Sequence, residues 1–132
     1  MSITYLHCAK VTSEQIAELY DSAGLQRPIK DLIRIQKMID NSDLIMTAWD
    51  QERLVGAARA ITDYSYCCYL SDLAVHNDYQ KQGIGSELVK HLQSLLGDEV
   101  MVLLLSVPEA MNYYPKLGFE KIENAFLIPR KR

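Results

Sequence analysis

Residues 69–89 read YLSDLAVHNDYQKQGIGSELV, and their pattern changes from that of a strand to that of a helix. Residues 69–75 end in an apolar run that is typical of a β-strand. A polar turn follows, and from Ile84 onward the apolar residues recur at helical spacing. A loop that contains Gly83 and Gly85 therefore joins a strand to the first turn of a helix.

A loop of this shape is suited to bind an anion, because the first N–H groups of a helix are unpaired and its dipole is positive there. Glycine has no Cβ, so a phosphate oxygen can approach the backbone closely, and Lys81 adds a positive charge. The Rossmann pattern fails, because Leu88 stands where its third glycine is required. The Walker pattern fails too, because Ser86 and Glu87 follow the second glycine. A tight turn without a ligand is the alternative interpretation.

Two motifs follow one another along this part of the chain. The first is Leu73-Ala74-Val75 followed by Gln80-x-x-Gly83-x-Gly85, and the second is AMNYYPKLGF at residues 110–119. Together they resemble the acyl-CoA-binding signature of the GNAT superfamily of N-acetyltransferases, Gln/Arg-x-x-Gly-x-Gly/Ala with a downstream Ala-x-x-x-Tyr-x-x-x-Gly-Phe. The motifs and the strands between them cover roughly residues 53–124.

The resemblance implies acetyl-CoA as co-substrate and no metal. The loop would hold the diphosphate, and backbone groups of Leu73 and Val75 would pair with the pantetheine arm between two splayed strands, 66–75 and 100–107. The residues expected to bind the cofactor on this basis are Leu73, Ala74, Val75, Gln80, Lys81, Gln82, Gly83, Ile84, Gly85, Ser86 and Tyr114. Val107 stands where many family members have an Asn that contacts the pantetheine.

The same resemblance implies three candidate catalytic residues, Tyr114, Asp72 and Ser71. Tyr114 occupies the position of the family's general acid, whereas the neighbouring Tyr113 is interpreted as a core aromatic. Ser71 stands where the family often has an acidic residue or histidine that serves the amine. Asp72 is the nearest carboxylate, and it either relays the amine proton or anchors a neighbouring loop or Arg59.

The remaining chain predicts one mixed α/β domain, 1–132, with the element order β-α-α-β-β-β-α-β-α-β-β. Thr12 to Gln15 match a capping box, and Gly24 is placed to end the helix that follows. By the resemblance, the sheet is mostly antiparallel and splays between its fourth and fifth strands, and the loop 24–28 borders the acceptor site or is a plain connector. The expected strands are 3–6, 44–49, 54–61, 66–75, 100–107, 120–123 and 126–128, and the expected helices are 12–24, 28–40, 83–96 and 108–117.

Composition excludes several other classes of protein. The chain has 48% apolar and 23% charged residues, a globular balance, and its net charge of −3 gives no footprint for nucleic acid. No signal peptide or membrane-spanning run is expected. The cysteines, Cys8, Cys67 and Cys68, show no metal-type spacing, which favours packing roles and reduced thiols in the cytoplasm.

Arg59 interrupts an apolar strand face and therefore needs a partner, either a structural ion pair or a ligand.

The resemblance implies an acetyl-CoA-dependent N-acetyltransferase that acts on a primary amine, more readily of a small molecule than of a protein. The alternative is a catalytically silent acyl-CoA-binding module, which the serine at position 71 keeps open. Tyr64, Tyr66 and Tyr69 either line an aromatic-amine pocket or pack the sheet. A homodimer is possible, because members of the family often pair through their sheets.

Overall fold

A single sheet in the order β1-β2-β3-β4-β5 forms the centre of the computed structural model, which describes residues 2–132. Its first four strands are antiparallel, and β5 runs parallel to β4. The predicted mixed α/β class with a mostly antiparallel sheet is therefore confirmed. The strands are β1 (Thr4–Leu6), β2 (Leu44–Asp50), β3 (Arg53–Thr62), β4 (Cys67–Val75) and β5 (Met101–Leu103).

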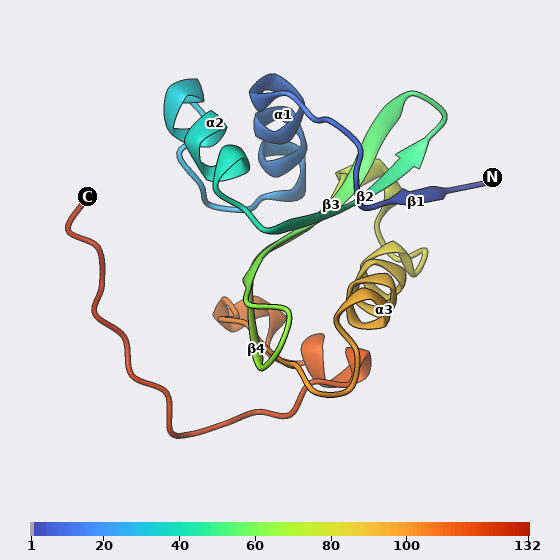
Figure 1. Ribbon diagram of the computed structural model, residues 1–132. Coiled ribbons are helices and arrows are strands. Elements are labelled where there is room, and N and C mark those ends of the chain that lie inside the picture. The colour runs from blue at the N-terminus through green and yellow to red at the C-terminus, as the bar shows by residue number, and fades with distance from the viewer. Residues whose placement is uncertain (1) are drawn as a thin grey trace.

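Helices cover both faces of this sheet (Figure 1). The helices α1 (Ser13–Ala23) and α2 (Leu32–Asp40) lie on one face, where Ile16, Tyr20 and Ile35 pack against Ala57 and Ala74. The helix α3 (Ile84–Leu96) lies on the other, where its buried leucines pack against β2, β3 and β4. Two apolar layers therefore hold the sheet from opposite sides. Short 3₁₀ turns complete the chain: η1 (Asn77–Tyr79), η2 (Pro108–Ala110) and η3 (Tyr114–Leu117).

Local signals set most helix ends where the sequence predicts them. The Thr12 side chain accepts a hydrogen bond from the Gln15 N–H at 3.0 Å, and the Gln15 side chain accepts one from the Thr12 N–H at 2.9 Å. Gly24 ends α1 with a φ of 75°. The second helix is the exception, because it begins at Leu32 rather than at Pro28. The Asp31 carboxylate accepts the Arg34 N–H at 3.1 Å and caps the helix there, after a turn in which the Asp31 N–H bonds the Pro28 carbonyl.

A β-bulge in the middle of β4 changes which residues face the helices. The ladder with β3 passes from Leu70 opposite Ala60 to Asp72 opposite Arg59, so Ser71 has no partner in it. Leu70 packs in the layer beneath α3, whereas Ala74 packs in the layer beneath α1 and α2. Because the extra residue shifts the alternation, Asp72 lies on the face covered by α1 and α2.

The C-terminal third of the chain departs most from prediction. The strand expected over 100–107 pairs only at Met101–Leu103, and the helix expected over 108–117 is the two short turns η2 and η3. The strands expected at 120–123 and 126–128 are absent from the described chain, because residues 120–132 run as an exposed arc that meets no strand edge (Figure 1). A strand pattern without an adjacent edge has no partner for its peptide groups.

Two further expectations concern cysteines and membrane spans. The prediction of a packing role is right for Cys68, which is buried, and wrong for Cys8 and Cys67, which are exposed. Over residues 2–132, no helix combines the length and apolar character that crossing a membrane requires.

Candidate active site

A cleft of about 950 Å³ opens between the loop that follows α1 and the end of the sheet. Ser71 and Leu73 of β4 line one side, and residues 104–107, which follow β5, line another. Arg27 and Tyr114 also reach the cleft. The loop 24–28, for which the sequence left open a place beside the acceptor site or a role as a plain connector, borders this cleft. Of the candidate catalytic residues, Ser71 and Tyr114 line the cleft, and Asp72 lies buried beside it.

The cleft continues into a gap between β4 and β5. The two strands pair only from Cys67 to Tyr69 on β4, after which β4 continues alone to Val75. On its other edge, the stretch from Leu73 to Val75 pairs with β3 in the normal antiparallel register. The edge that faces β5 therefore offers unpaired peptide groups to an extended ligand, which is the predicted splay.

The loop between η1 and α3 has the geometry of an anion site. Lys81 and Gly83 both adopt left-handed backbone conformations, with φ of 65° and 83°. No side chain caps α3, so the N–H groups of its first turn remain available. Successive N–H groups in such a turn form an anion-binding concavity. The Gln80 side-chain amide donates to the Val75 carbonyl at 3.1 Å and ties this loop to the end of β4.

Tyr113 lies against the first turn of α3, where the sequence interpretation did not place it. A Cβ at position 85 would clash with the Tyr113 hydroxyl oxygen. The Tyr113 side chain is partly exposed and forms an edge-to-face pair with Tyr114, with ring centroids 5.3 Å apart. The interpretation of Tyr113 as a core aromatic is therefore wrong. Its hydroxyl belongs to the surroundings of the anion loop, and no local pattern in the sequence indicates this.

Tyr114, in η3, presents a protonated hydroxyl to the cleft. Its ring packs edge-to-face on Phe119, with centroids 5.9 Å apart. Burial raises the pKa of Tyr114, and the neighbouring Tyr113 raises it further. The phenol therefore keeps its proton at neutral pH and is able to donate it to an acceptor in the cleft.

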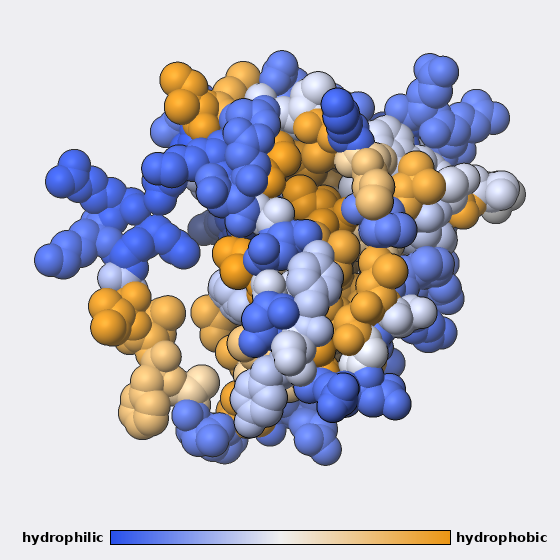
Figure 2. Space-filling view, in the orientation of Figure 1, coloured by the Kyte–Doolittle hydropathy of each residue, from blue (hydrophilic) through white to orange (hydrophobic). Residues whose placement is uncertain are grey.

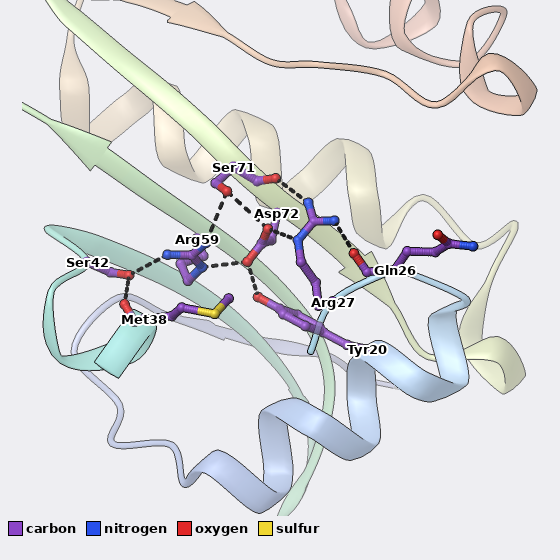
Figure 3. Close-up of polar contacts among 8 residues, drawn as sticks. All are labelled: Tyr20, Gln26, Arg27, Met38, Ser42, Arg59, Ser71 and Asp72. Carbon is purple, nitrogen blue, oxygen red and sulfur yellow. Dashed lines mark hydrogen bonds and ion pairs between the residues drawn. The ribbon is translucent and has the colours of Figure 1, made fainter. Parts of the chain in front are cut away.

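Asp72 is the centre of a buried polar network (Figure 3). One carboxylate oxygen accepts hydrogen bonds from the Tyr20 hydroxyl at 2.7 Å and from Arg59 Nε. The other accepts from Arg27 Nε at 2.7 Å and from the Ser71 hydroxyl at 3.1 Å. Burial by itself would raise the pKa of Asp72, but the hydrogen bond and charge of Arg59, with the charge of Arg27, hold it below its usual value. Such a carboxylate is a poor proton acceptor.

Arg27 and Arg59 connect Asp72 to other parts of the fold. Arg59 is the structural ion pair that the sequence interpretation favoured, and it also donates to the hydroxyls of Ser42 at 3.1 Å and Ser71 at 3.0 Å. Arg27 also donates to the Ser71 carbonyl at 2.8 Å, which the bulge leaves without a strand partner. The loop 24–28 is thereby fixed to the sheet. The sequence interpretation missed this role of Arg27, although a buried carboxylate requires partners.

The charged side chains that line the cleft are mostly basic. One of them is an aspartate and five are arginines: Asp21, Arg27, Arg34, Arg59, Arg130 and Arg132. This local excess of positive charge contrasts with the net charge of −3 for the whole chain. Among the tyrosines, Tyr69 lines the cleft, whereas Tyr64 and Tyr66 are exposed and lie outside its lining.

Comparison with known proteins agrees with this geometry. Residues 10–127 match the family model of the acetyltransferase (GNAT) domain. An uncharacterized N-acetyltransferase, ycf52, of Pyropia yezoensis is 30% identical over 127 residues. That match covers 88% of this chain and 71% of the relative.

Solved structures share the fold over nearly the whole chain. A probable acetyltransferase of unknown function from meticillin-resistant Staphylococcus aureus superimposes with a TM-score of 0.84 at 26% identity, covering 99% of this chain and 100% of its own. An aminoglycoside N-acetyltransferase solved in complex with CoA gives a TM-score of 0.74 at 16% identity, covering 99% and 96%. The second likeness is one of fold alone.

Proposed function

This chain belongs to the GNAT family of acetyltransferases, and we propose that it moves an acetyl group from acetyl-CoA to the primary amine of a small acceptor. One observation supports the proposal above all. Leu73, on the open edge of β4, and the protonated Tyr114 line one cleft, and the Gln80 side chain ties the loop before the uncapped start of α3 to Val75 at the end of the same strand. Tyr114 is far from the other two features in the sequence, and acetyl transfer needs all three together.

The residues around that space fit acetyl-CoA. The N–H groups of the first turn of α3, with Gly83, Gly85 and Lys81, suit a diphosphate by charge and by close backbone approach. The peptide groups between Leu73 and Val75 that face β5 have no strand partner and suit the amides of a pantetheine arm, while the Val75 carbonyl also accepts the Gln80 side chain. When bound, acetyl-CoA supplies the acetyl thioester. The protein holds it with groups that fold into place before any ligand arrives.

Tyr114 is the proposed general acid. Transfer of the acetyl group to an amine breaks a carbon–sulfur bond, and the departing thiolate needs a proton. A phenol whose pKa is raised by burial stays protonated until it meets such a base. Its place in the lining of the cleft that Ser71 and Leu73 also line supports this role.

Asp72 is proposed as a positioning residue and not as the base. Its two oxygens already accept four hydrogen bonds, and its pKa is lowered. It fixes Arg27, and through Arg27 the loop that closes one side of the cleft. The amine then gives up its proton to water in the cleft, and Ser71 contributes by holding the Asp72 carboxylate.

The lining of the cleft indicates the kind of acceptor. Arg27 and Arg59 are paired with Asp72, so the repulsion of a molecule with several positive charges comes from the other three arginines of the lining, Arg34, Arg130 and Arg132. We therefore propose a small primary amine that is otherwise neutral or that carries an acidic group. The structurally similar aminoglycoside N-acetyltransferase acts, as its name says, on aminoglycosides. The proposed acceptor of this chain differs, because it carries no further positive charge.

Release of free thiol from acetyl-CoA, measured across paired amines, tests the proposal. Amino acids are compared with their amides, which lack the acidic group. Aromatic amines are compared with polyamines and lysine peptides. We expect turnover with a small amine and loss of that turnover in Tyr114→Phe. If acetyl-CoA binds but no amine is acetylated, the silent binding module is the correct interpretation. If polyamines are the best acceptors, transfer stands and the proposed acceptor class fails.

A further inference from the structure

The acceptor cleft contains arginine side chains for which the fold supplies no carboxylate. Over residues 2–132, three arginines of the lining form no ion pair: Arg34, Arg130 and Arg132. Asp21 is the single acidic side chain among the described residues of this lining. In Figure 2 the end of the chain, at the left, is hydrophilic and stands beside the body with a hollow between them. Cations that face a cleft without partners are suited to an anion inside it.

The helix α2 turns Arg34 toward this cleft. Arg34 and Met38 are four residues apart, so they share one face of the helix, and both line the cleft. The backbone N–H of Arg34 bonds to Asp31, but its guanidinium has no hydrogen-bond partner within the described chain. Lys37 carries the same charge on the same helix and lies outside the lining. The guanidinium of Arg34 is therefore available to a ligand.

Arg27 is held by the fold and still has donors to spare. A guanidinium has five N–H groups. Its Nε donates to Asp72 at 2.7 Å, Nη1 to the Gln26 carbonyl at 2.6 Å and Nη2 to the Ser71 carbonyl at 2.8 Å (Figure 3). Each terminal nitrogen thus keeps one N–H without a partner in the described chain, and the side chain is 28% exposed in the lining of the cleft. Two N–H groups on one guanidinium match the two oxygens of a carboxylate.

The position of Arg27 sets how far such a carboxylate lies from the reacting amine. Arg27 is fixed to the Ser71 carbonyl. Leu73, whose peptide groups are proposed to pair with the pantetheine, lies two residues further along β4. A strand advances about 3.3 Å per residue, so the two places are roughly 7 Å apart. A small molecule whose amine and carboxylate are a few bonds apart spans this distance.

We propose that the acceptor is an amino acid, and that Arg27 and Arg34 bind its carboxylate while its amine faces the thioester. The inference rests on the proposed function, because it names the acceptor of the same transfer. The amine nitrogen bonds to the acetyl carbon as the carbon–sulfur bond breaks. The thiolate takes its proton from Tyr114, and the nitrogen gives a proton to water, from which the phenol is protonated again.

The charges of the cleft favour an amino acid over its own amide. At neutral pH the carboxylate of a free amino acid offsets its ammonium charge, whereas the amide remains a cation. The unpaired arginines of the lining repel the amide and not the amino acid. The carboxylate also gives Arg34 the counter-ion that the described chain does not supply.

Steady-state kinetics with glycine, leucine and phenylalanine, each against its amide, tests the acceptor class. We expect kcat/KM of the acid to exceed that of the amide by about 100-fold, since each hydrogen bond to a charged group is worth roughly tenfold. Arg34→Gln should lower this ratio by about tenfold, through a higher KM for the acid. Lys37→Gln removes the same charge outside the cleft and should leave the ratio unchanged.

Arg27→Lys provides a second variant, checked for folding by urea denaturation. Lysine keeps the charge but not the paired N–H groups, so the ratio of acid to amide should fall in this variant too. A folded Arg27→Lys protein with an unchanged ratio would overturn the role of Arg27.

Titration calorimetry with N-acetylleucine and N-acetylleucinamide, in the presence of CoA, measures the carboxylate contact without catalysis. We expect the acid to bind more tightly, by about tenfold or more, and Arg34→Gln to remove most of the difference. If this preference is seen but no amine is acetylated, the carboxylate site stands and the proposed transfer fails. If acids and amides are acetylated equally well, the transfer stands and the inference is overturned. Equal effects of Arg34→Gln and Lys37→Gln would overturn it as well, because the cause would then be general charge and not contact.

Discussion

The hydroxyl oxygen of Tyr113 occupies the place where a side chain at position 85 would begin. Gly85 is therefore required for two reasons: the proposed approach of the diphosphate from one side and this hydroxyl from another. The second requirement belongs to this chain and can be removed without touching the loop.

We predict that Gly85→Ala weakens acetyl-CoA binding on the order of tenfold, the effect of a small overpacking. Adding Tyr113→Phe should recover most of the loss, because the next atom of that ring lies 3.5 Å from the Cβ, an ordinary contact. Titration calorimetry with CoA on both variants checks this. Equal weakening in the single and double variants would show that the hydroxyl is not the obstacle.

Tyr114→Phe should lower the turnover number by about 100-fold or more, the usual contribution of a general acid, with little change in the affinity for acetyl-CoA. Turnover falls because the substitution removes the hydroxyl group that donates the proton. Affinity changes little because the aromatic ring remains in place. Steady-state kinetics and a separate binding measurement distinguish the two effects. Tyr66→Phe is the matched control, because Tyr66 is 76% exposed and lies outside the cleft lining. A Tyr114→Phe enzyme of normal turnover would remove this residue from the mechanism.

Asp72→Asn should lower the free energy of unfolding by about 3–5 kcal/mol, because it leaves the buried guanidinium of Arg59 without its counter-ion. Urea denaturation measures the loss. Asp98→Asn, an exposed change near the end of α3, should stay within about 0.5 kcal/mol of the unchanged chain. A loss no larger than in that control would mean that the network contributes little.

The pH dependence of stability follows from the lowered pKa of Asp72. In the unfolded chain this carboxyl takes up a proton near pH 4, roughly its ordinary pKa, while the folded chain keeps it ionised to lower pH. The contribution of Asp72 is therefore complete above about pH 4 and is lost as the pH falls further. Unfolding free energies from pH 7 down to 3 should fall more steeply for the unchanged chain than for Asp72→Asn. Parallel curves would contradict the ion pair as the cause.

The acceptor should set the pH profile of catalysis. If water and not Asp72 takes the amine proton, the rate per acceptor concentration rises with pH up to the pKa of the amine itself. Two acceptors of different basicity should then show profiles displaced by the difference between their pKa values. A shared inflection near neutral pH for both amines would instead identify a base on the protein.

What the sequence predicts well is local. The capping box at Thr12, the ends at Gly24 and Gly97 and the glycine loop before α3 depend on neighbouring residues, and all lie where expected. The gap between β4 and β5 could also be anticipated, though from the family resemblance.

What the sequence misses depends on distant partners. Arg27 and Asp72 are separated by 45 positions, and only the bulge at Ser71 brings the carboxylate to the correct face. Residues 126–128 alternate as a strand should, yet a strand forms only where an edge accepts its hydrogen bonds. Periodicity indicates the side-chain pattern and not the presence of that edge.

Arg27 serves the cleft and the core with one side chain, and this has a consequence for how the enzyme can change. A substitution of Arg27 that alters acceptor preference also removes its ion pair with Asp72. A change of specificity and a loss of stability would therefore arise from the same mutation. The neighbouring positions 24–26 and 28–29 also line the cleft, but their side chains make no bond to Asp72. Evolution in the laboratory should therefore accumulate its changes around Arg27 and retain the arginine, unless the starting protein is first made more stable.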